Sequence, residues 1–200
     1  MKKWLVPVII IGVLVFLGVN TYNSIIPKRN AAEKQWANVE SAYQRRADLI
    51  PNIVKTVQGA ADFEKSTLEG VIKARAEATN TSINVGDLTP ENMAKFQQAQ
   101  SGLSGALSKL MVVVERYPEL KANQNFLELQ SQLEGTENRI NVERNRFNEV
   151  ATVYKNYIEK FPTNLFAKVF GFNHLPLFKS DAGSENAPDV DFNFSGDKKE

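Results

Sequence analysis

Glu134, Glu137 and Glu143 are the residues whose spacing best suits catalysis, because carboxylates along one helix can act as general acid and base. The simpler interpretation is that they are solvated or ion-paired residues of a helix surface. No glycine-rich phosphate loop, nucleophile elbow or His-Glu-x-x-His pattern occurs in the sequence. We therefore predict that the protein is not an enzyme and uses no cofactor, and we keep carboxylate catalysis as the alternative.

Metal and nucleic-acid chemistry are also disfavoured by composition. His174 is the only histidine and lies outside the predicted helices, whereas a carboxylate di-iron site in a helical bundle needs Glu-x-x-His pairs on two helices. The chain has no cysteine, which excludes disulfides and thiolate metal sites. The formal net charge is only +1 and basic residues alternate with acidic ones, so we expect neither a metal nor a nucleic acid as a partner.

The helix that carries the three carboxylates is the longest predicted element and runs from Tyr117 to Phe161. Large apolar residues recur along it at every seventh position: Phe126, Leu133, Ile140, Phe147, Tyr154 and Phe161. A sustained heptad is typical of a coiled coil or helical bundle, and a helix of roughly 40 residues would be about 60 Å long. Such a helix needs partner helices to cover its apolar seam.

Three further helices supply these partners. Residues 28–58 repeat Trp36, Tyr43, Ile50 and Val57 at steps of seven, residues 60–79 form a shorter helix, and residues 90–117 repeat Phe96, Leu103, Leu110 and Tyr117. Thr89 followed by Pro90 is typical of a helix start. Pro27 and Pro51 predict kinks or breaks, because proline lacks the amide that a helix interior needs. We predict an all-α fold in which residues 28–162 form an antiparallel four-helix bundle.

Arg46 and Glu143 are charged residues on the otherwise apolar rows of the first and last helices. If Lys28 lies opposite Phe161 in an antiparallel arrangement, Arg46 lies opposite Glu143. The sequence therefore predicts a partly buried ion pair that sets the helix register, as polar residues at heptad positions do elsewhere. The alternative is that both side chains extend outward into water.

The N-terminal segment predicts a membrane anchor over residues 1–27. No charged residue occurs from Trp4 to Pro27, which is long enough to span a bilayer. A cleaved signal peptide would begin similarly, but the residues after Gly18 do not form a clean cleavage site, so we favour a retained anchor. Trp4 and Tyr22 would then lie at the two membrane interfaces. Basic residues flank both ends of the segment, and their count slightly favours a cytoplasmic location for the domain.

The C-terminal residues follow the predicted bundle in two parts. Residues 163–179 are apolar and predict a short amphipathic helix over 164–170, which either caps the bundle or contacts the membrane interface through Phe166 and Phe170. Residues 180–200 are polar and predict a disordered tail. Within this tail, Val190, Phe192 and Phe194 alternate as in a motif that adds to the sheet edge of a partner.

Three segments of the chain resemble the LemA family of bacterial membrane proteins: RRADLIPNIV (Arg45 to Val54), ERYPELKANQNFLELQSQLEGTENRI (Glu115 to Ile140) and RNRFNEVATVYKNYIEKFP (Arg144 to Pro162). The resemblance runs from the anchor to about Phe172. One departure is Phe147, where the family more often has tyrosine. The resemblance implies one N-terminal membrane helix with a short exterior N-terminus and an antiparallel helical domain, and it implies no agreed activity or catalytic residues.

These observations together predict a single-pass protein of the bacterial cytoplasmic membrane. An anchor joined to a long helical domain without a chemical site is typical of a scaffold or interaction module, whose partners are the lipid bilayer and an unidentified protein. The alternative is a regulator or accessory subunit of an envelope enzyme such as a membrane protease.

Overall fold

The computed structural model of the chain describes residues 4–59 and 63–179. Its regular elements, in chain order, are α1 (Leu5–Gln58), α2 (Lys65–Asn80), the short 3₁₀ helix η2 (Val85–Asp87), α3 (Pro90–Val114), α4 (Pro118–Lys121), α5 (Gln124–Glu159) and α6 (Thr163–Val169). No strand occurs among the described residues, so the predicted all-α class is confirmed.

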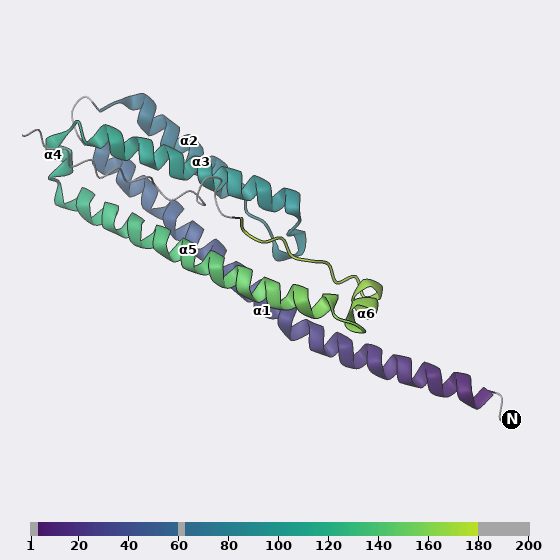
Figure 1. Cartoon of the computed structure of the whole chain (residues 1–200). Helices are drawn as coiled ribbons and strands as arrows, with labels where there is room; N and C mark the ends of the chain where they lie inside the picture. Colours follow the sequence, from purple (N-terminus) through teal and green to yellow (C-terminus); the bar gives the residue numbers. More distant parts are fainter. Residues whose placement is uncertain (1–3, 60–62, 180–200) are drawn as a thin grey trace, which may run out of the picture.

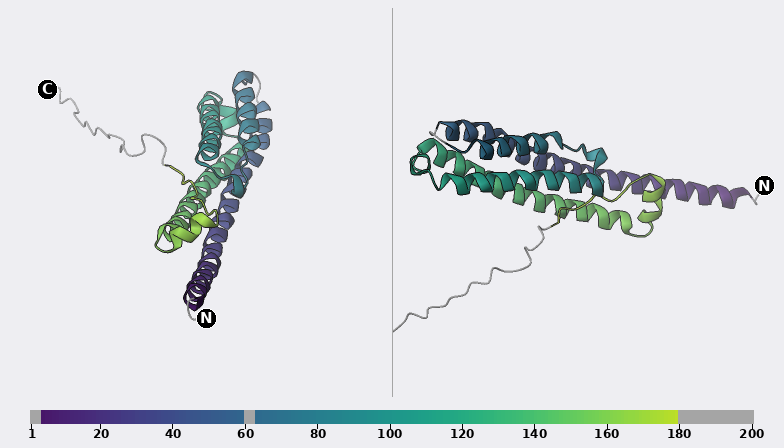
Figure 2. Two further views of the ribbon diagram at one scale, coloured as in Figure 1. Left: turned by 90° about the vertical axis from the view of Figure 1, so that its right-hand side faces the viewer. Right: turned by 90° about the horizontal axis from the view of Figure 1, so that it is seen from above.

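Helix α1 runs the whole length of the molecule, and the other helices pack on its C-terminal part (Figure 1). Helix α5 lies along α1 and runs in the opposite direction, while α2 and α3 lie side by side (Figure 2). The short α6 follows α5 and contacts α1. Beyond α6, the N-terminal part of α1 extends alone (Figure 1).

Helix α1 is continuous over 54 residues and includes both Pro27 and Pro51. The expectation of a helix boundary at either proline is therefore wrong. At Pro51 the ring leaves the carbonyl of Ala47 without its usual amide donor. The Nε–H of Arg75 on α2 replaces that donor, because it donates to the Ala47 carbonyl oxygen at 2.8 Å. Buried residues on both sides of the proline, Ile50 and Ile53, keep the helix packed through this point.

Replacing Arg75 with methionine is expected to lower the free energy of unfolding by about 1–2 kcal/mol, because the Ala47 carbonyl then lacks a donor. The variant Pro51→Ala restores the helical amide, so Arg75→Met should cost less in the Pro51→Ala background. Urea denaturation of the four proteins of this double-mutant cycle measures the difference. Lys73→Met, at an exposed position of the same helix, is the matched control. Equal costs in both backgrounds would contradict this role for Arg75.

The longest predicted helix begins later than expected. Residues 118–121 form the separate α4, and α5 begins at Gln124 because the Asn123 side chain accepts hydrogen bonds from the amides of Asn125 and Phe126 at 3.0 and 3.3 Å. An asparagine N-cap of this kind is a strong helix start. The expectation of one helix from Tyr117 to Phe161 is thus wrong at its N-terminal end.

The heptad positions of α1 and of the long predicted helix that contains α5 form the core with one exception. Phe126, Leu133, Ile140, Phe147 and Tyr154 of α5 are all buried, as are Trp36, Tyr43, Ile50 and Val57 of α1. The exception is Phe161, which is 80% exposed. Helix α5 ends at Glu159, so the heptad pattern no longer governs where the Phe161 side chain points.

The core is divided into three clusters along the molecule. The one farthest from the free end of α1 is mainly aliphatic, with Phe126 as its buried aromatic residue, and the middle one is rich in aromatic rings around Trp36. The third lies next to the free part of α1 and contains Ile25, Tyr154, Ile158, Ala167 and Phe172. Ile25, which the predicted anchor would place among lipids, is therefore fully covered by protein.

Candidate functional site

Arg46 lies at the centre of a polar network that connects four helices. Its side chain is 2% exposed and pairs with Glu137 Oε1 on α5. It also donates to Ser104 Oγ at 2.7 Å and to Gln100 Oε1 at 2.7 Å, both on α3. The Gln100 amide in turn donates to the carbonyl of Ala78 on α2 at 3.2 Å. A buried cation needs such acceptors, because an unpaired charge inside a protein is strongly destabilising.

The predicted pairing of Arg46 with Glu143 is wrong. Glu143 is buried, as expected, but its carboxylate accepts a hydrogen bond from Gln35 Nε2 at 2.7 Å. Arg146 and Arg139 approach the same carboxylate at 3.4 and 3.8 Å. The partner of Arg46 is Glu137, which is less than two helical turns before Glu143 in the sequence.

The cause of this error lies in the helix ends from which the register was deduced. The predicted register placed Lys28 opposite Phe161, as if one helix started at Lys28 and the other ended at Phe161. In the structure, α1 is continuous past Lys28 and α5 ends at Glu159. We also did not predict the other two side chains that accept hydrogen bonds from Arg46, Ser104 and Gln100. Gln100 replaces an apolar residue on the inner face of α3, between the buried residues Phe96 and Leu103. That pattern is a detectable signal for a buried polar contact.

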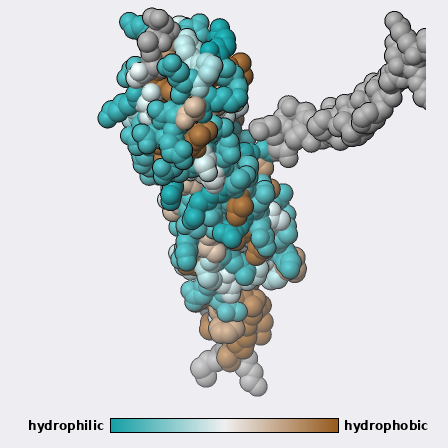
Figure 3. Space-filling model, turned by 90° about the vertical axis from the view of Figure 1, so that its left-hand side faces the viewer, coloured by the Kyte–Doolittle hydropathy of each residue, from teal (hydrophilic) through white to brown (hydrophobic). Residues whose placement is uncertain are grey.

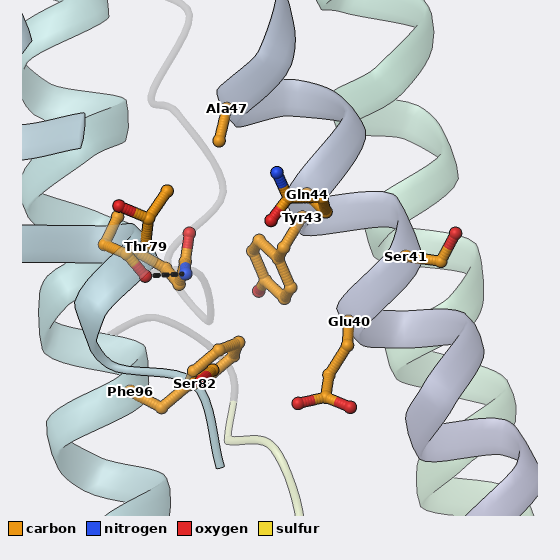
Figure 4. A pocket seen from close by; sticks show the side chains of 10 residues that line it. Glu40, Ser41, Tyr43, Gln44, Ala47, Thr79, Ser82 and Phe96 are labelled. Carbon is orange, nitrogen blue, oxygen red and sulfur yellow. Dashed lines mark hydrogen bonds between the residues drawn. The ribbon is translucent and has the colours of Figure 1, made fainter. Parts of the chain in front are cut away.

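A cleft of about 270 Å³ lies beside this network, between α1 and the end of α2. Glu40, Tyr43 and Gln44 of α1 face Thr79, Ser82 and Phe96 across it (Figure 4). Burial raises the pKa of the Glu40 carboxyl above its ordinary value, while the Trp36 side chain and the Ile83 backbone amide act in the opposite direction. The cleft thus contains a carboxyl group that is costly to ionise.

Glu40→Gln is expected to stabilise the protein at pH 7 more than at pH 4. Since the folded pKa of Glu40 is raised, the folded state binds its proton more tightly, and stability is lost as the pH rises from the unfolded pKa through the folded one. Glutamine does not ionise, so the Glu40→Gln variant does not lose this stability as the pH rises. Thermal unfolding of both proteins at the two pH values measures it, with Glu91→Gln, on the exposed start of α3, as control. A larger gain in stability at pH 4 than at pH 7 would contradict the upward shift of the Glu40 pKa.

The three carboxylates considered for catalysis have separate structural surroundings. Glu137 pairs with Arg46, which agrees with its interpretation as an ion-paired residue. Glu143 is bonded to Gln35, and the exposed Glu134 accepts a hydrogen bond from Gln130 at 3.1 Å. Over residues 4–59 and 63–179, no group of three histidine or acidic residues is arranged to hold a metal ion.

Tyr22, Phe166 and Phe170, which were predicted to contact the membrane interface, lie together in the structure. The Tyr22 ring meets the Phe170 ring edge to face at 5.3 Å and the Phe172 ring at 5.6 Å. Phe166 and Phe170 lie over Gly18, where a Cβ atom would come within 3.4–3.7 Å of their rings. The fourth predicted interface residue, Trp4, lies far from this cluster at the start of α1 and is exposed.

After α6 the chain returns along α5 as an extended strap over residues 172–179. The Tyr154 hydroxyl donates to the Asn173 carbonyl at 3.0 Å. The Asn148 side chain both donates to the Phe178 carbonyl and accepts from the Phe178 amide, at 2.9 and 2.8 Å. The Phe178 ring stacks on Trp36 at 5.8 Å. The predicted partner motif, Val190, Phe192 and Phe194, and the predicted disordered tail lie outside the described residues.

The chain is similar in sequence to proteins of one known family. The model of the LemA family matches residues 35–192, which is most of the chain. The chain belongs to the LemA family. Protein LemA of Metamycoplasma hominis is 23% identical over 173 residues, which cover 86% of this chain and 75% of that protein. The family resemblance of the three sequence segments is confirmed.

Two magnetosome proteins are also similar to this LemA-family chain. Magnetosome protein MamQ of Magnetospirillum gryphiswaldense is 29% identical over 174 residues, and MamQ 1 of Paramagnetospirillum magneticum is 26% identical over 175 residues. The match covers 78–79% of this chain but only 64% of either MamQ protein. The chain thus spans less than two thirds of the length of these relatives.

Proposed function

We propose that this LemA-family chain is a single-pass protein of the cytoplasmic membrane that acts as a non-enzymatic scaffold for a protein partner. The observation that carries the proposal is the continuity of α1. The same helix begins with a run of exposed apolar residues and continues, without interruption, into the buried core. A partner bound to the helical domain is therefore held at a fixed place relative to the anchor.

The N-terminal part of α1 supports anchorage. It is long and apolar enough to cross a membrane, and from Leu5 to Leu17 its side chains are all exposed. In water this would be a large unfavourable apolar surface, whereas in a bilayer the same side chains face acyl chains. The space-filling view shows apolar residues gathered at this end of the molecule, while most of the visible helical domain is hydrophilic (Figure 3).

The helical domain supports the scaffold role through its rigidity. We interpret α1, α2, α3 and α5 as an antiparallel four-helix bundle, held in register by the Arg46 network and by the three core clusters. The most buried charged side chains, those of Arg46 and Glu143, form hydrogen bonds between these helices. The names of the relatives, Protein LemA and Magnetosome protein MamQ, state no reaction. The domain faces the cytoplasm in this proposal, in agreement with the slight excess of basic residues after the anchor.

Site-specific photo-crosslinking in intact cells tests the proposal. A photoreactive amino acid is introduced at Val142 and Val153 on α5, Val112 on α3 and Ile72 on α2, which are exposed apolar positions of the helical domain. We expect one protein to be captured from neighbouring positions on one face. The capture should be lost in a Val13→Asp variant, which places a charge in the anchor and releases the chain from the membrane.

Two outcomes would contradict the proposal. One is the absence of any specific adduct from all four positions. The other is capture that persists when Val13→Asp has released the protein, since the anchor would then be irrelevant. If the captured protein is a membrane protease whose activity in isolated membranes changes when this chain is deleted, the chain is a regulator or accessory subunit instead of a passive scaffold.

A further inference from the structure

Three apolar side chains form an exposed row at the end of the helical domain. Phe161 is 80% exposed, Leu165 55% and Val169 80%, and they follow one another at intervals of four residues. Leu165 and Val169 lie on one face of α6, whereas Phe161 lies in the turn between α5 and α6. We call these residues the α6 face. The buried residues of α6, Thr163 and Ala167, point the other way, into the protein.

The α6 face lies beside the place where α1 loses its protein cover. Phe166 and Phe170 of α6 pack over Gly18, which is the first buried residue of α1. Every residue from Leu5 to Leu17 is exposed, whereas Ile25 is fully buried. The exposed apolar surface of α1 therefore ends beside α6, and this position makes lipid the medium expected around the α6 face.

The charge of the segment agrees with an anionic lipid surface. Residues 160–179 contain Lys160, Lys168 and Lys179 and no acidic residue. Lys160 and Lys168 are exposed, and each directly precedes a residue of the α6 face, Phe161 and Val169 respectively. Lysines beside an exposed apolar row are typical of helices that lie in the membrane interface, where the charged groups stay among the headgroups and the apolar side chains enter the acyl boundary.

We propose that α6 is a second membrane contact, which lies in the interface of the leaflet from which α1 emerges. Phe161, Leu165 and Val169 enter the acyl boundary, and Lys160 and Lys168 bind anionic headgroups. This inference rests on the anchorage of α1 proposed above. It places the membrane surface near Gly18 and Tyr22, so about 15 residues of α1 are left to cross the hydrocarbon layer, roughly 22 Å at 1.5 Å per residue. This span is shorter than a typical hydrocarbon layer of about 30 Å. The proposed position of α6 therefore requires the bilayer to be thinner around the protein.

Spin labels on single cysteines test this inference, and the absence of native cysteine makes each introduced one unique. The variants are Val169→Cys and Leu165→Cys on the α6 face, Val13→Cys in the anchor and Val153→Cys on α5. Val13 and Val153 are 51% and 53% exposed and so match Leu165. The labelled full-length chain is placed in vesicles of phosphatidylcholine with or without phosphatidylglycerol. Collision of the label with oxygen, which concentrates in lipid, and with a water-soluble nickel chelate is then measured.

We expect the labels at Val13, Leu165 and Val169 to collide preferentially with oxygen and the label at Val153 with nickel. Phosphatidylglycerol should increase the oxygen preference at Leu165 and Val169, and a Lys160→Gln/Lys168→Gln variant should lose this increase. A lipid signal at Val13 with nickel access at Val169 would overturn the inference but leave anchorage intact. Protection of Val169 from both reagents would overturn it in favour of a covering protein, and nickel access at Val13 would overturn both proposals.

Discussion

Replacing Glu137 with leucine is expected to lower the free energy of unfolding by about 3 kcal/mol. The substitution removes the carboxylate that pairs with Arg46 and leaves the guanidinium buried among neutral acceptors. Breaking a buried pair by removing one partner costs about 3–5 kcal/mol, and the lower end applies because the Glu137 side chain is itself 36% exposed. Urea denaturation followed by far-ultraviolet circular dichroism measures the loss.

A double-mutant cycle separates this charge effect from lost packing. Adding Arg46→Met removes the stranded cation, so the double variant should be more stable than Glu137→Leu alone. Glu134→Leu, at an exposed position three residues away on the same helix, is the matched control and should change stability by less than about 0.5 kcal/mol. Strong coupling of Arg46 to Glu143, with none to Glu137, would show that the register described above is wrong.

Replacing Trp36 with alanine is expected to cost about 4 kcal/mol, because large-to-small substitutions of this kind in a core cost about 3–5 kcal/mol. Trp36 is fully buried and contacts the rings of Phe96, Phe147 and Phe178 at 5.3–5.8 Å between centroids. Its loss leaves a cavity in the middle cluster and also frees the strap, which Phe178 holds against the helices. Hydrogen exchange of residues 172–179 should therefore accelerate together with the global loss of stability.

The more conservative variant Trp36→Phe isolates the polar contribution. The indole Nε1–H of Trp36 donates to the Ile83 carbonyl at 3.0 Å, and phenylalanine leaves that carbonyl without this donor while retaining most of the ring packing. We expect a loss of about 1 kcal/mol or somewhat more. Trp4→Ala, at an exposed position near the N-terminus, should leave the stability of the helical domain unchanged. Equal costs for Trp36→Phe and Trp36→Ala would contradict the cavity argument.

The helices and most of their inner faces could be predicted because they follow from local periodicity. A seven-residue repeat specifies one face of a helix wherever the helix continues, so Trp36, Tyr43, Phe147 and Tyr154 were all correctly expected in the core. The same reasoning failed for Phe161, because the repeat carries no information on where the helix ends.

Contacts between helices were harder to predict, since they depend on the register of one helix against another. Arg46 is buried, as the ion-pair hypothesis required and the outward-facing alternative did not, but its partners come from α3 and α5, and a shift of less than two turns replaced Glu143 with Glu137. The continuity of α1 was also missed. Proline at position 51 indicated a kink or a boundary, and the boundary is excluded because α1 continues through it; Arg75, distant in sequence, supplies the missing donor to Ala47. A contact between two residues this far apart in the sequence cannot be predicted from local sequence patterns.

In the proposed anchorage, the unbroken α1 sets the distance from the membrane at which a partner protein could bind. From Tyr22 to Gln58 the helix rises by roughly 55 Å at 1.5 Å per residue, and α4 lies at its distant end (Figure 1). In the proposed anchorage this end lies far from the headgroups, because α1 has no break between the proposed membrane span and the helical domain. In that arrangement, a membrane-bound partner with a short extramembrane part would contact the domain only near α6, whereas a partner that contacts α4 would have to extend as far from the bilayer as this chain does.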